Sequence, residues 1–308
     1  MEGLREQWLI LISMPVYIII IGLELVLTHM QHRKAYTVKD TVHNVYLTLL
    51  NAGLDIIFRA AYVGILGYFF QHALMTWQHV VAYWIMLLVA EDFMYYWLHR
   101  FDHEVRLFWA VHVTHHSSRY FNFTIGFRSS VFEPLYRFIY FIPLAWLGFQ
   151  PLDIVFMYSA TQIWGTLVHT ELVNKLGWLE YILVTPSHHR VHHASNPKYL
   201  DKNMGMFLII WDKIFGTFQA ELPAEEYQPI KYGLTTDLVD TNPGNLVFHE
   251  WKQMVQDVSR EDLTIQEKIG YVLGPPGWSH DGSRMTSEEM RAAEEGQVPV
   301  GAMVSRQS

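Results

Sequence analysis

Apolar residues are concentrated in the first 215 positions, where they form long runs separated by short polar stretches. The run from Trp8 to Leu27 contains a single charge, Glu24, and its roughly 20 residues are enough to cross a bilayer core about 30 Å thick. It is too long for a signal peptide and lacks a small-residue cleavage site. Two further runs extend from Val45 to Phe70 and from Val80 to Leu98. The pattern therefore predicts three membrane helices in the first hundred residues.

Polar residues interrupt the second and third runs in a regular way. Asn51, Asp55 and Arg59 are spaced four apart, so they share one helix face. We expect this stripe to face protein rather than lipid. Glu91 and Asp92 lie close to the end of the third run.

A fourth and a fifth apolar run extend from Leu135 to Phe149 and from Leu152 to Val168. Only Gln150 and Pro151 separate them, so we predict a helical hairpin.

The distribution of Lys and Arg predicts an orientation, because these residues mark the short cytosolic flanks of membrane helices. The segment 71–79, between the second and third runs, has no Lys or Arg. We therefore expect a multi-pass protein whose N-terminus lies across the membrane and whose hairpin returns to the cytosolic side. The membrane would be the endoplasmic reticulum in a eukaryote or the inner membrane in a bacterium. The basic residues of the two flanks are Arg33, Lys34, Lys39, Arg100, Arg106, Arg119 and Arg128.

After about residue 216 the chain becomes polar, and its acidic residues account for much of the net charge of -8. This charge argues against nucleic acid as a partner. We divide the chain into a membrane helix with its basic flank (1–40), a catalytic membrane domain (41–220), a polar cytosolic segment (221–270) and a disordered tail (271–308).

Histidine is the candidate metal ligand, because the chain has 17 histidines and no cysteine. Eight of the histidines form three clusters, and each cluster has a spacing that places its imidazoles on one side of a helix. Each cluster follows an apolar run on the same predicted side of the membrane. The clusters are His99 and His103; His112, His115 and His116; and His189, His192 and His193.

Eight imidazoles are too many for one metal ion, since a zinc site takes four ligands and a catalytic one commonly three plus water. We therefore expect two metal ions to share the eight imidazoles. His169, at the end of the fifth run, is a candidate ninth ligand, although a single histidine there can also be a hydrogen-bonding residue. His188 is a weaker candidate, because on a helix it would point away from its neighbours. The predicted fold is an all-α membrane bundle with a cytosolic, histidine-rich helical cap that holds a di-metal site.

Neutral imidazoles suit iron, zinc, copper and nickel alike, so the ligands alone do not identify the metal. A site at the edge of a membrane bundle suggests a lipid substrate, and inert C–H bonds call for activated oxygen and iron. Asp92, seven residues before His99, could accept a hydrogen bond from a ligand imidazole or could join two helices. Glu104 could relay protons, support a ligand or be a surface charge.

The segment DFMYYWLHRFDHEVRLFWAVHVTHHSS (92–118), followed by TPSHHRVHH and DKNMGMFLIIWDKIFGTF, resembles the fatty acid hydroxylase and sterol desaturase superfamily. The motifs HTELVNKLG, FRSSV and YGLTT are similar to its ether-lipid-cleaving branch, the alkylglycerol monooxygenases. The resemblance implies two iron ions held by the eight clustered histidines and His169, with Glu104 as the acid of the motif. It also implies tetrahydrobiopterin as a possible cofactor and a glyceryl ether as substrate, which hydroxylation would convert to a fatty aldehyde and a glycerol derivative.

Several alternatives remain open at this point. A sterol or a fatty acyl chain could replace the ether lipid as substrate. A zinc hydrolase would use metal-bound hydroxide and need no oxygen. A metal transporter would need polar residues along its helices, and only the Asn51, Asp55 and Arg59 stripe offers them. The chain has no dinucleotide-binding motif, so we expect electrons to come from a separate donor or a reduced pterin.

Overall fold

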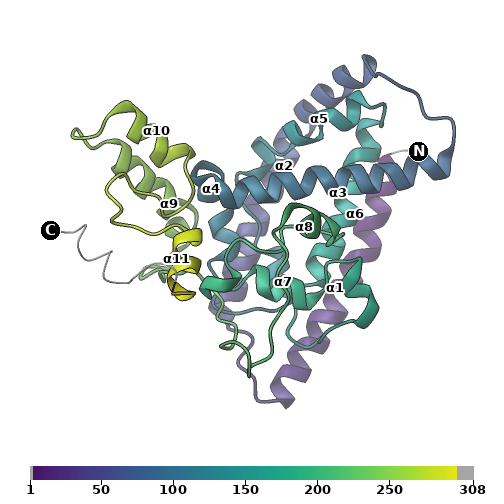
Figure 1. Ribbon diagram of the computed structural model, residues 1–308. Coiled ribbons are helices and arrows are strands. Elements are labelled where there is room, and N and C mark those ends of the chain that lie inside the picture. The colour runs from purple at the N-terminus through teal and green to yellow at the C-terminus, as the bar shows by residue number, and fades with distance from the viewer. Residues whose placement is uncertain (1–2, 297–308) are drawn as a thin grey trace.

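The computed structural model describes residues 3–296, and every regular element within them is a helix (Figure 1). Three long helices dominate: α1 (Gly3–Met30), α2 (Val38–Gln71) and α3 (Val80–Glu104). All three are long and apolar enough to cross a membrane. The three runs predicted from the sequence are therefore confirmed as candidate membrane helices.

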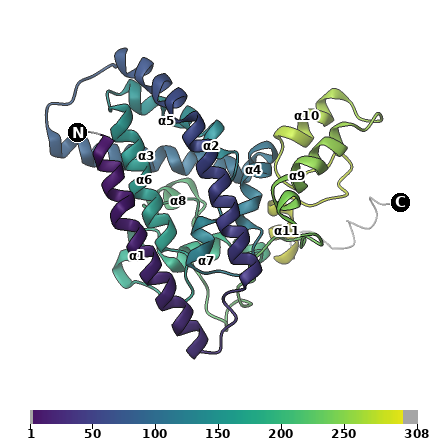
Figure 2. The same cartoon turned by 180° about the vertical axis from the view of Figure 1, so that it is seen from behind.

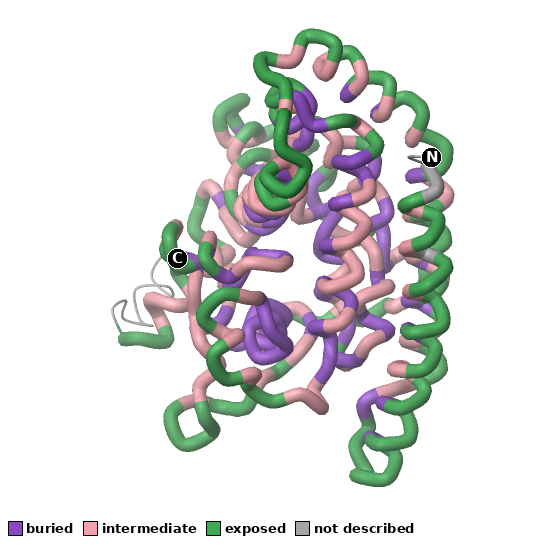
Figure 3. The backbone as a smooth tube through the Cα atoms, turned by 90° about the vertical axis from the view of Figure 1, so that its right-hand side faces the viewer, coloured by how far each residue is buried: buried purple, intermediate pink, exposed green. Residues whose placement is uncertain are grey.

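The apolar side chains of these helices largely face outward. Only 12% of the most apolar window of α1 and 17% of that of α2 are buried inside the protein. Figures 2 and 3 show the two helices along the outside of the bundle, with exposed residues along most of α1. Such a surface is expected where lipid rather than water surrounds the protein. The exposed side chains include Leu11, Ile18, Ile19, Leu23, Leu49, Ile56 and Ile57.

The predicted hairpin forms, but its first helix is shorter than the sequence suggested. α5 (Phe138–Trp146) has 9 residues and α6 (Pro151–Leu167) has 17. Nine residues rise only about 14 Å, less than the thickness of a bilayer core. The turn between the helices needs Gly148, whose φ is +85° and whose added Cβ would lie 2.2 Å from the carbonyl oxygen of Met75. The hairpin thus packs into the bundle as α5 and α6, while a complete crossing by it stays a prediction.

The polar stripe of α2 faces protein, as predicted. Asn51 donates to the carbonyl of Ser130 at 2.7 Å, and Asp55 pairs with both Arg59 and Arg137. Structural polar contacts therefore account for all three residues of the stripe.

Short elements follow the long helices and contain most of the clustered histidines. α4 (Arg106–His116) begins one residue after α3, where the extended backbone of Val105 turns the chain. Two more short helices, α7 (Pro186–His192) and α8 (Ile210–Phe215), pack beneath α3 in Figure 1. The connections contain 3-10 turns at Phe123–Phe127, Glu133–Leu135, Gly177–Tyr181 and Pro197–Tyr199.

The C-terminal region forms a lobe beside α4 (Figure 1). It contains α9 (Pro243–Val258), α10 (Ile265–Leu273) and α11 (Ser287–Glu294). Residues 271–296 therefore differ from the disordered tail that we expected. Thr286 caps α11 through a reciprocal contact with Glu289, and the ion pair of Arg284 with Asp257 ties the preceding loop to α9. The rest of that predicted tail, 297–308, lies outside the described residues.

Candidate metal centre

Helices α3 and α4 bring five histidines to one place. His99 and His103 lie one turn apart on α3, and His112 and His116 lie one turn apart on α4. His115 precedes His116, so its imidazole is displaced around α4 from the face of the other two. The i to i+4 spacing in the sequence thus places the two histidines of each pair on the same face of their helix.

Helix α7 supplies the remaining cluster. Thr185 and His188 form a reciprocal cap at the start of this helix, with Pro186 as its first residue. His188 contributes to this cap, and its side chain also lies 3.8 Å from Glu180. His189, His192 and His193 follow the cap, and the rings of His192 and His193 contact histidine rings of α3 and α4.

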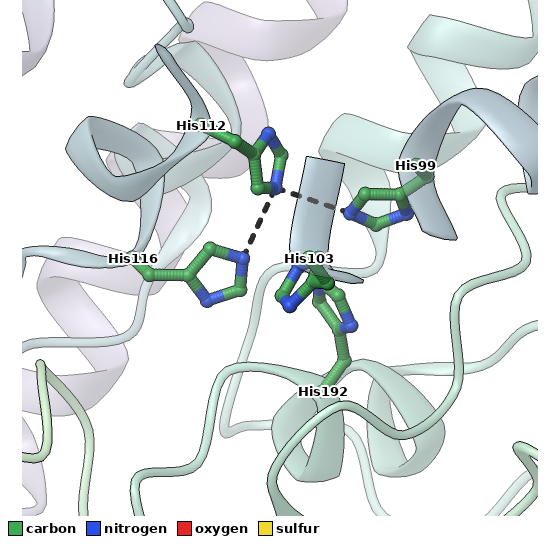
Figure 4. Close-up of side chains that lie close together, drawn as sticks. All are labelled: His99, His103, His112, His116 and His192. Atoms are coloured by element: carbon green, nitrogen blue, oxygen red, sulfur yellow. Dashed lines mark hydrogen bonds between the residues drawn. The ribbon is translucent and has the colours of Figure 1, made fainter. Parts of the chain in front are cut away.

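The nine histidines form two adjacent groups of buried ring nitrogens. The five-histidine group consists of His99, His103, His112, His116 and His192, shown in Figure 4. The four-histidine group consists of His115, His169, His189 and His193. The groups abut, since the rings of His116 and His193 are stacked with centroids 4.4 Å apart.

Hydrogen bonds on the far side of the rings aim their Nε2 atoms into the five-histidine group. The Nδ1 atoms of His99 and His192 donate to the carbonyls of Met204 and Lys202 at 2.8 and 3.0 Å. A neutral imidazole has one N–H, so each Nε2 then carries a lone pair. These contacts are the outer support that metal-binding histidines usually have.

The spacing of the Nε2 atoms fits a shared cation. The Nε2 of His112 lies 3.2 Å from the Nε2 of both His99 and His116. Two nitrogens bound to one metal at about 2.1 Å lie about 3.0–3.4 Å apart. The buried Nε2 atoms of His103 and His192 have no hydrogen-bond partner. Facing lone pairs and unpartnered nitrogens are therefore explained if a metal ion completes the group.

The four-histidine group has the same design. The Nδ1 atoms of His115 and His169 donate to the carbonyls of Arg128 and Gly165. The Nε2 of His169 then lies 3.4, 3.1 and 2.9 Å from those of His115, His193 and His189. The geometry thus brings His169 together with the clustered histidines, as the candidate ninth ligand.

Burial favours the neutral, metal-binding form of most of these imidazoles. It lowers the pKa of His115 to about 4, because removal from water disfavours the charged imidazolium. Burial, reinforced by the neighbouring imidazoles, lowers the pKa of further histidines well below the ordinary value. These are His112, His116, His169, His189, His192 and His193.

The two acidic residues singled out from the sequence lie elsewhere. The carboxylate of Asp92 accepts from the backbone N–H groups of Phe207 and Leu208 and from the indole of Trp211, not from a ligand imidazole. Two helical turns separate Asp92 from His99, about 10 Å along the axis. Glu104 pairs with Arg100, and its side chain is 42% exposed, as a surface charge would be.

Other acidic residues contact the ligands instead. Asp201 accepts from the Nδ1 of His103 at 3.2 Å. Asp102 is fully buried, and its carboxylate lies near His112 and Glu133. Sequence reasoning missed Asp201, because nothing in its spacing relates it to a histidine 98 residues earlier.

A cavity of about 370 Å³ extends from the histidines into the helix bundle. We call it the bundle cavity. His99, His112 and His169 line it, and its walls combine apolar residues such as Leu66 and Phe141 with the polar stripe of α2. The cavity therefore lies among residues of α1, α2, α3 and α6 and borders both histidine groups.

Residues 84–217, which include all nine histidines, match a family model described as Fatty acid hydroxylase. This segment belongs to the fatty acid hydroxylase family. The resemblance inferred from the histidine motifs is thereby confirmed, and the fatty acid hydroxylase domain covers the chain from α3 to just beyond α8.

Curated relatives extend the match beyond the fatty acid hydroxylase domain. Human alkylglycerol monooxygenase is 37% identical over 224 residues, 72% of this chain and 49% of the relative. The Danio rerio alkylglycerol monooxygenase is 35% identical over 244 residues, 77% of this chain and 53% of the relative. A Delta(7)-sterol 5(6)-desaturase from Gibberella zeae is more distant, at 28% identity over 162 residues, 50% of this chain and 46% of the relative. The chain spans about half the length of these relatives, and no solved structure matches it.

Proposed function

We propose that this chain is a membrane-bound non-haem di-iron monooxygenase that hydroxylates a lipid. One observation carries the proposal: two groups of clustered imidazoles border a cavity that is lined by helices able to cross a membrane. The relatedness to lipid-modifying enzymes agrees with it.

The residues of the protein would bind the metal ions, orient the imidazole rings and exclude water from the site. The nine histidines would bind the two metal ions, which when bound would activate oxygen. The loop 201–204 and the carbonyls of Arg128 and Gly165 fix the orientation of the rings. The buried walls of the bundle cavity would keep water from the reacting carbon.

The favoured substrate is a glyceryl ether, as the alkylglycerol monooxygenase relatives suggest. One oxygen atom of O₂ would enter a C–H bond of the carbon next to the ether oxygen, and the other would leave as water with two electrons and two protons from a donor. The hemiacetal so formed would break into a fatty aldehyde and a glycerol derivative. A sterol or fatty acyl chain is the alternative substrate, because a sterol desaturase also matches.

We further propose that the histidine groups lie at the cytosolic face. The flanks around Lys34 and Arg106 would remain on that side, and the segment 71–79 on the other. Cysteines introduced at Lys34 and at Gln78 test this placement through their labelling by an impermeant reagent. Labelling of Gln78→Cys alone in sealed cytosol-side-out vesicles would contradict it.

The decisive experiment is anaerobic purification, metal analysis and an assay with an alkylglycerol. We expect about two irons per chain and aldehyde formation that needs both oxygen and a reductant, with tetrahydrobiopterin tested against other donors. Activity in the absence of oxygen with bound zinc would instead indicate a hydrolase. Metal uptake by vesicles that survives replacement of His115 and His116 would indicate a transporter.

A further inference from the structure

Glu24 is the single charge in the first apolar run of the sequence, and neither histidine group includes it. It lies near the end of α1, and only 1% of its surface is exposed. A carboxylate in a helix that can cross a membrane is costly, so such residues usually face the protein interior and serve a function. Helix α1 lies outside the fatty acid hydroxylase match, which begins at residue 84. The contacts of Glu24 therefore indicate what α1 adds to that domain.

The Glu24 carboxylate accepts hydrogen bonds from three separate parts of the chain. Its Oε1 accepts from the hydroxyl of Thr170, which lies just beyond α6. Its Oε2 accepts from the hydroxyl of Tyr36, in the connection between α1 and α2, and from the backbone N–H of Phe123 at 2.9 Å. All three donors are uncharged groups. The main consequence of these bonds is therefore to hold three segments of the chain together at one point.

Thr170 links Glu24 to His169, the candidate ligand outside the three histidine clusters. His169 lies just beyond α6, and its backbone N–H donates to the carbonyl of Thr166 at 3.2 Å. On its other side, the buried hydroxyl of Thr170 donates to Glu24 and accepts from the backbone N–H of Leu172 at 3.1 Å. The backbone of His169 is thus fixed between the end of α6 and Glu24.

Phe123 links Glu24 to the packing around the same imidazole. Phe123 begins a 3-10 turn, and α1 packs against both this turn and α6 (Figure 2). Within the turn, a Cβ added to Gly126 would lie 3.2 Å from the Nδ1 of His169. Just before the turn, the ring of Phe121 lies 5.5 Å from that of His169, measured between centroids. Both routes from Glu24 therefore lead to His169.

We propose that Glu24 is a positioning residue that holds His169 in the four-histidine group. Thr170 fixes the backbone of this histidine, and Phe123 fixes the turn that packs against its ring. The loop 201–204 instead supplies outer hydrogen bonds to the five-histidine group, so the effect of Glu24 should be confined to one metal site. The inference rests on the proposed function in one respect, namely that each histidine group binds a metal ion.

The test measures the binding of ferrous iron to the full-length protein, without oxygen and in competition with a chelator. Loss of an outer partner of a metal ligand typically weakens metal binding about 10–100-fold. We expect Glu24→Ala to weaken the binding of one iron by about this factor and to leave the other unchanged. Glu24→Gln, whose amide oxygen still accepts a hydrogen bond, should recover part of the affinity. Thr170→Val removes only one of the links and should have a smaller effect than Glu24→Ala.

Glu6→Ala is the matched control. Glu6 is a second carboxylate on α1, about 27 Å along the helix axis from Glu24, and it accepts from Arg59 instead. This variant should bind both irons like the wild type. Weaker binding of the same iron by Glu6→Ala would mean that any disturbance of α1 has this effect, and would overturn the specific role of Glu24.

Double variants separate a positioning role from a general role in folding. In the His112→Ala protein only the four-histidine group is complete, so Glu24→Ala should lower the metal content further. In the His169→Ala protein the remaining iron lies in the five-histidine group, so Glu24→Ala should have no effect. Equal losses in both backgrounds, or wild-type binding by Glu24→Ala, would overturn the inference and leave the proposed function intact. A wild-type protein that does not bind iron in both groups would instead overturn the proposed function.

Discussion

The five-histidine and four-histidine groups share helices α4 and α7, but α3 completes the first, His169 beyond α6 completes the second, and different parts of the chain support them. Asp201, Lys202 and Met204 orient three rings of the five-histidine group, so one short loop supports most of it. The four-histidine group depends instead on the carbonyls of Arg128, after the Phe123–Phe127 turn, and of Gly165, in α6. The comparison predicts that the two proposed metal sites can be perturbed separately, one through the 201–204 loop and one through the packing of α6.

Removing one ligand from each group tests this separation most strongly. His112→Ala and His169→Ala should each lower activity by more than about 100-fold, since losing an outer partner alone typically costs about 10–100-fold in affinity or activity. Each variant should also retain about one metal per chain instead of two, because the other group stays complete. Metal analysis after gel filtration checks this. A variant that loses both metals would show that the groups are not separable.

Acid should destabilise the metal-free protein strongly. The ordinary pKa of histidine is about 6.5, and burial lowers that of His115 to about 4 in the folded chain. The unfolded chain therefore binds more protons between these values, so the free energy of unfolding falls as the pH drops from 6.5 toward 4. Denaturant titrations at pH 7.5 and 5.5 measure the change, and bound metal should reduce it. An unfolding free energy that is the same at both pH values would contradict the neutral state of the buried rings.

Two glycines allow each group to be disturbed without touching a ligand. A Cβ at Gly126 would lie 2.8 Å from the Cα of Thr166 and 3.2 Å from the Nδ1 of His169. A Cβ at Gly205 would lie 2.6 Å from the carbonyl oxygen of Leu208 and 3.0 Å from Asp212, which holds the 201–204 loop. Both alanine variants should speed metal release to a chelator, whereas Gly53→Ala, with open space around it, should not.

Double variants show which group each glycine supports. Gly205→Ala should lower the metal content further in the His169→Ala protein but not in the His112→Ala protein. Gly126→Ala should behave the opposite way. Equal effects in both backgrounds would mean that the two supports act on both groups together.

The smallest effects are expected at two acidic residues near the histidines, Asp201 and Glu104, which should differ in their influence on metal binding. Asp201→Asn should weaken metal binding about 10–100-fold by altering the partner of His103. Glu104→Gln should have little effect, because this residue forms an exposed ion pair, and such pairs contribute about 0–1 kcal/mol. Metal-competition titrations compare them. A larger loss of metal affinity with Glu104→Gln than with Asp201→Asn would show that Glu104, not Asp201, supports the metal site.

The long helices and the histidine clusters could be predicted from the sequence, because both depend on residues that are close together along the chain. The spacing in HRFDH and HVTHH fixes which imidazoles share a helix face, and long apolar runs fix α1 to α3. The supporting groups could not be predicted, since Asp201 and Met204 reach their histidines across about 100 positions through a loop with Asp201 and Asn203 at positive φ. The C-terminal lobe was missed for a related reason: its order depends on the long-range ion pairs of Asp257 with Arg106 and Arg284.

The central claim is that nine histidines hold two irons for an oxygen-dependent reaction on a lipid. Mössbauer spectroscopy of anaerobically purified, iron-57-loaded protein, with product measured after reduction and oxygen exposure of the same sample, tests it most directly. We predict about two irons per chain in histidine-rich environments, and aldehyde release from an alkylglycerol only after oxygen is added. Product formation by iron-free protein, or without oxygen, would contradict the claim.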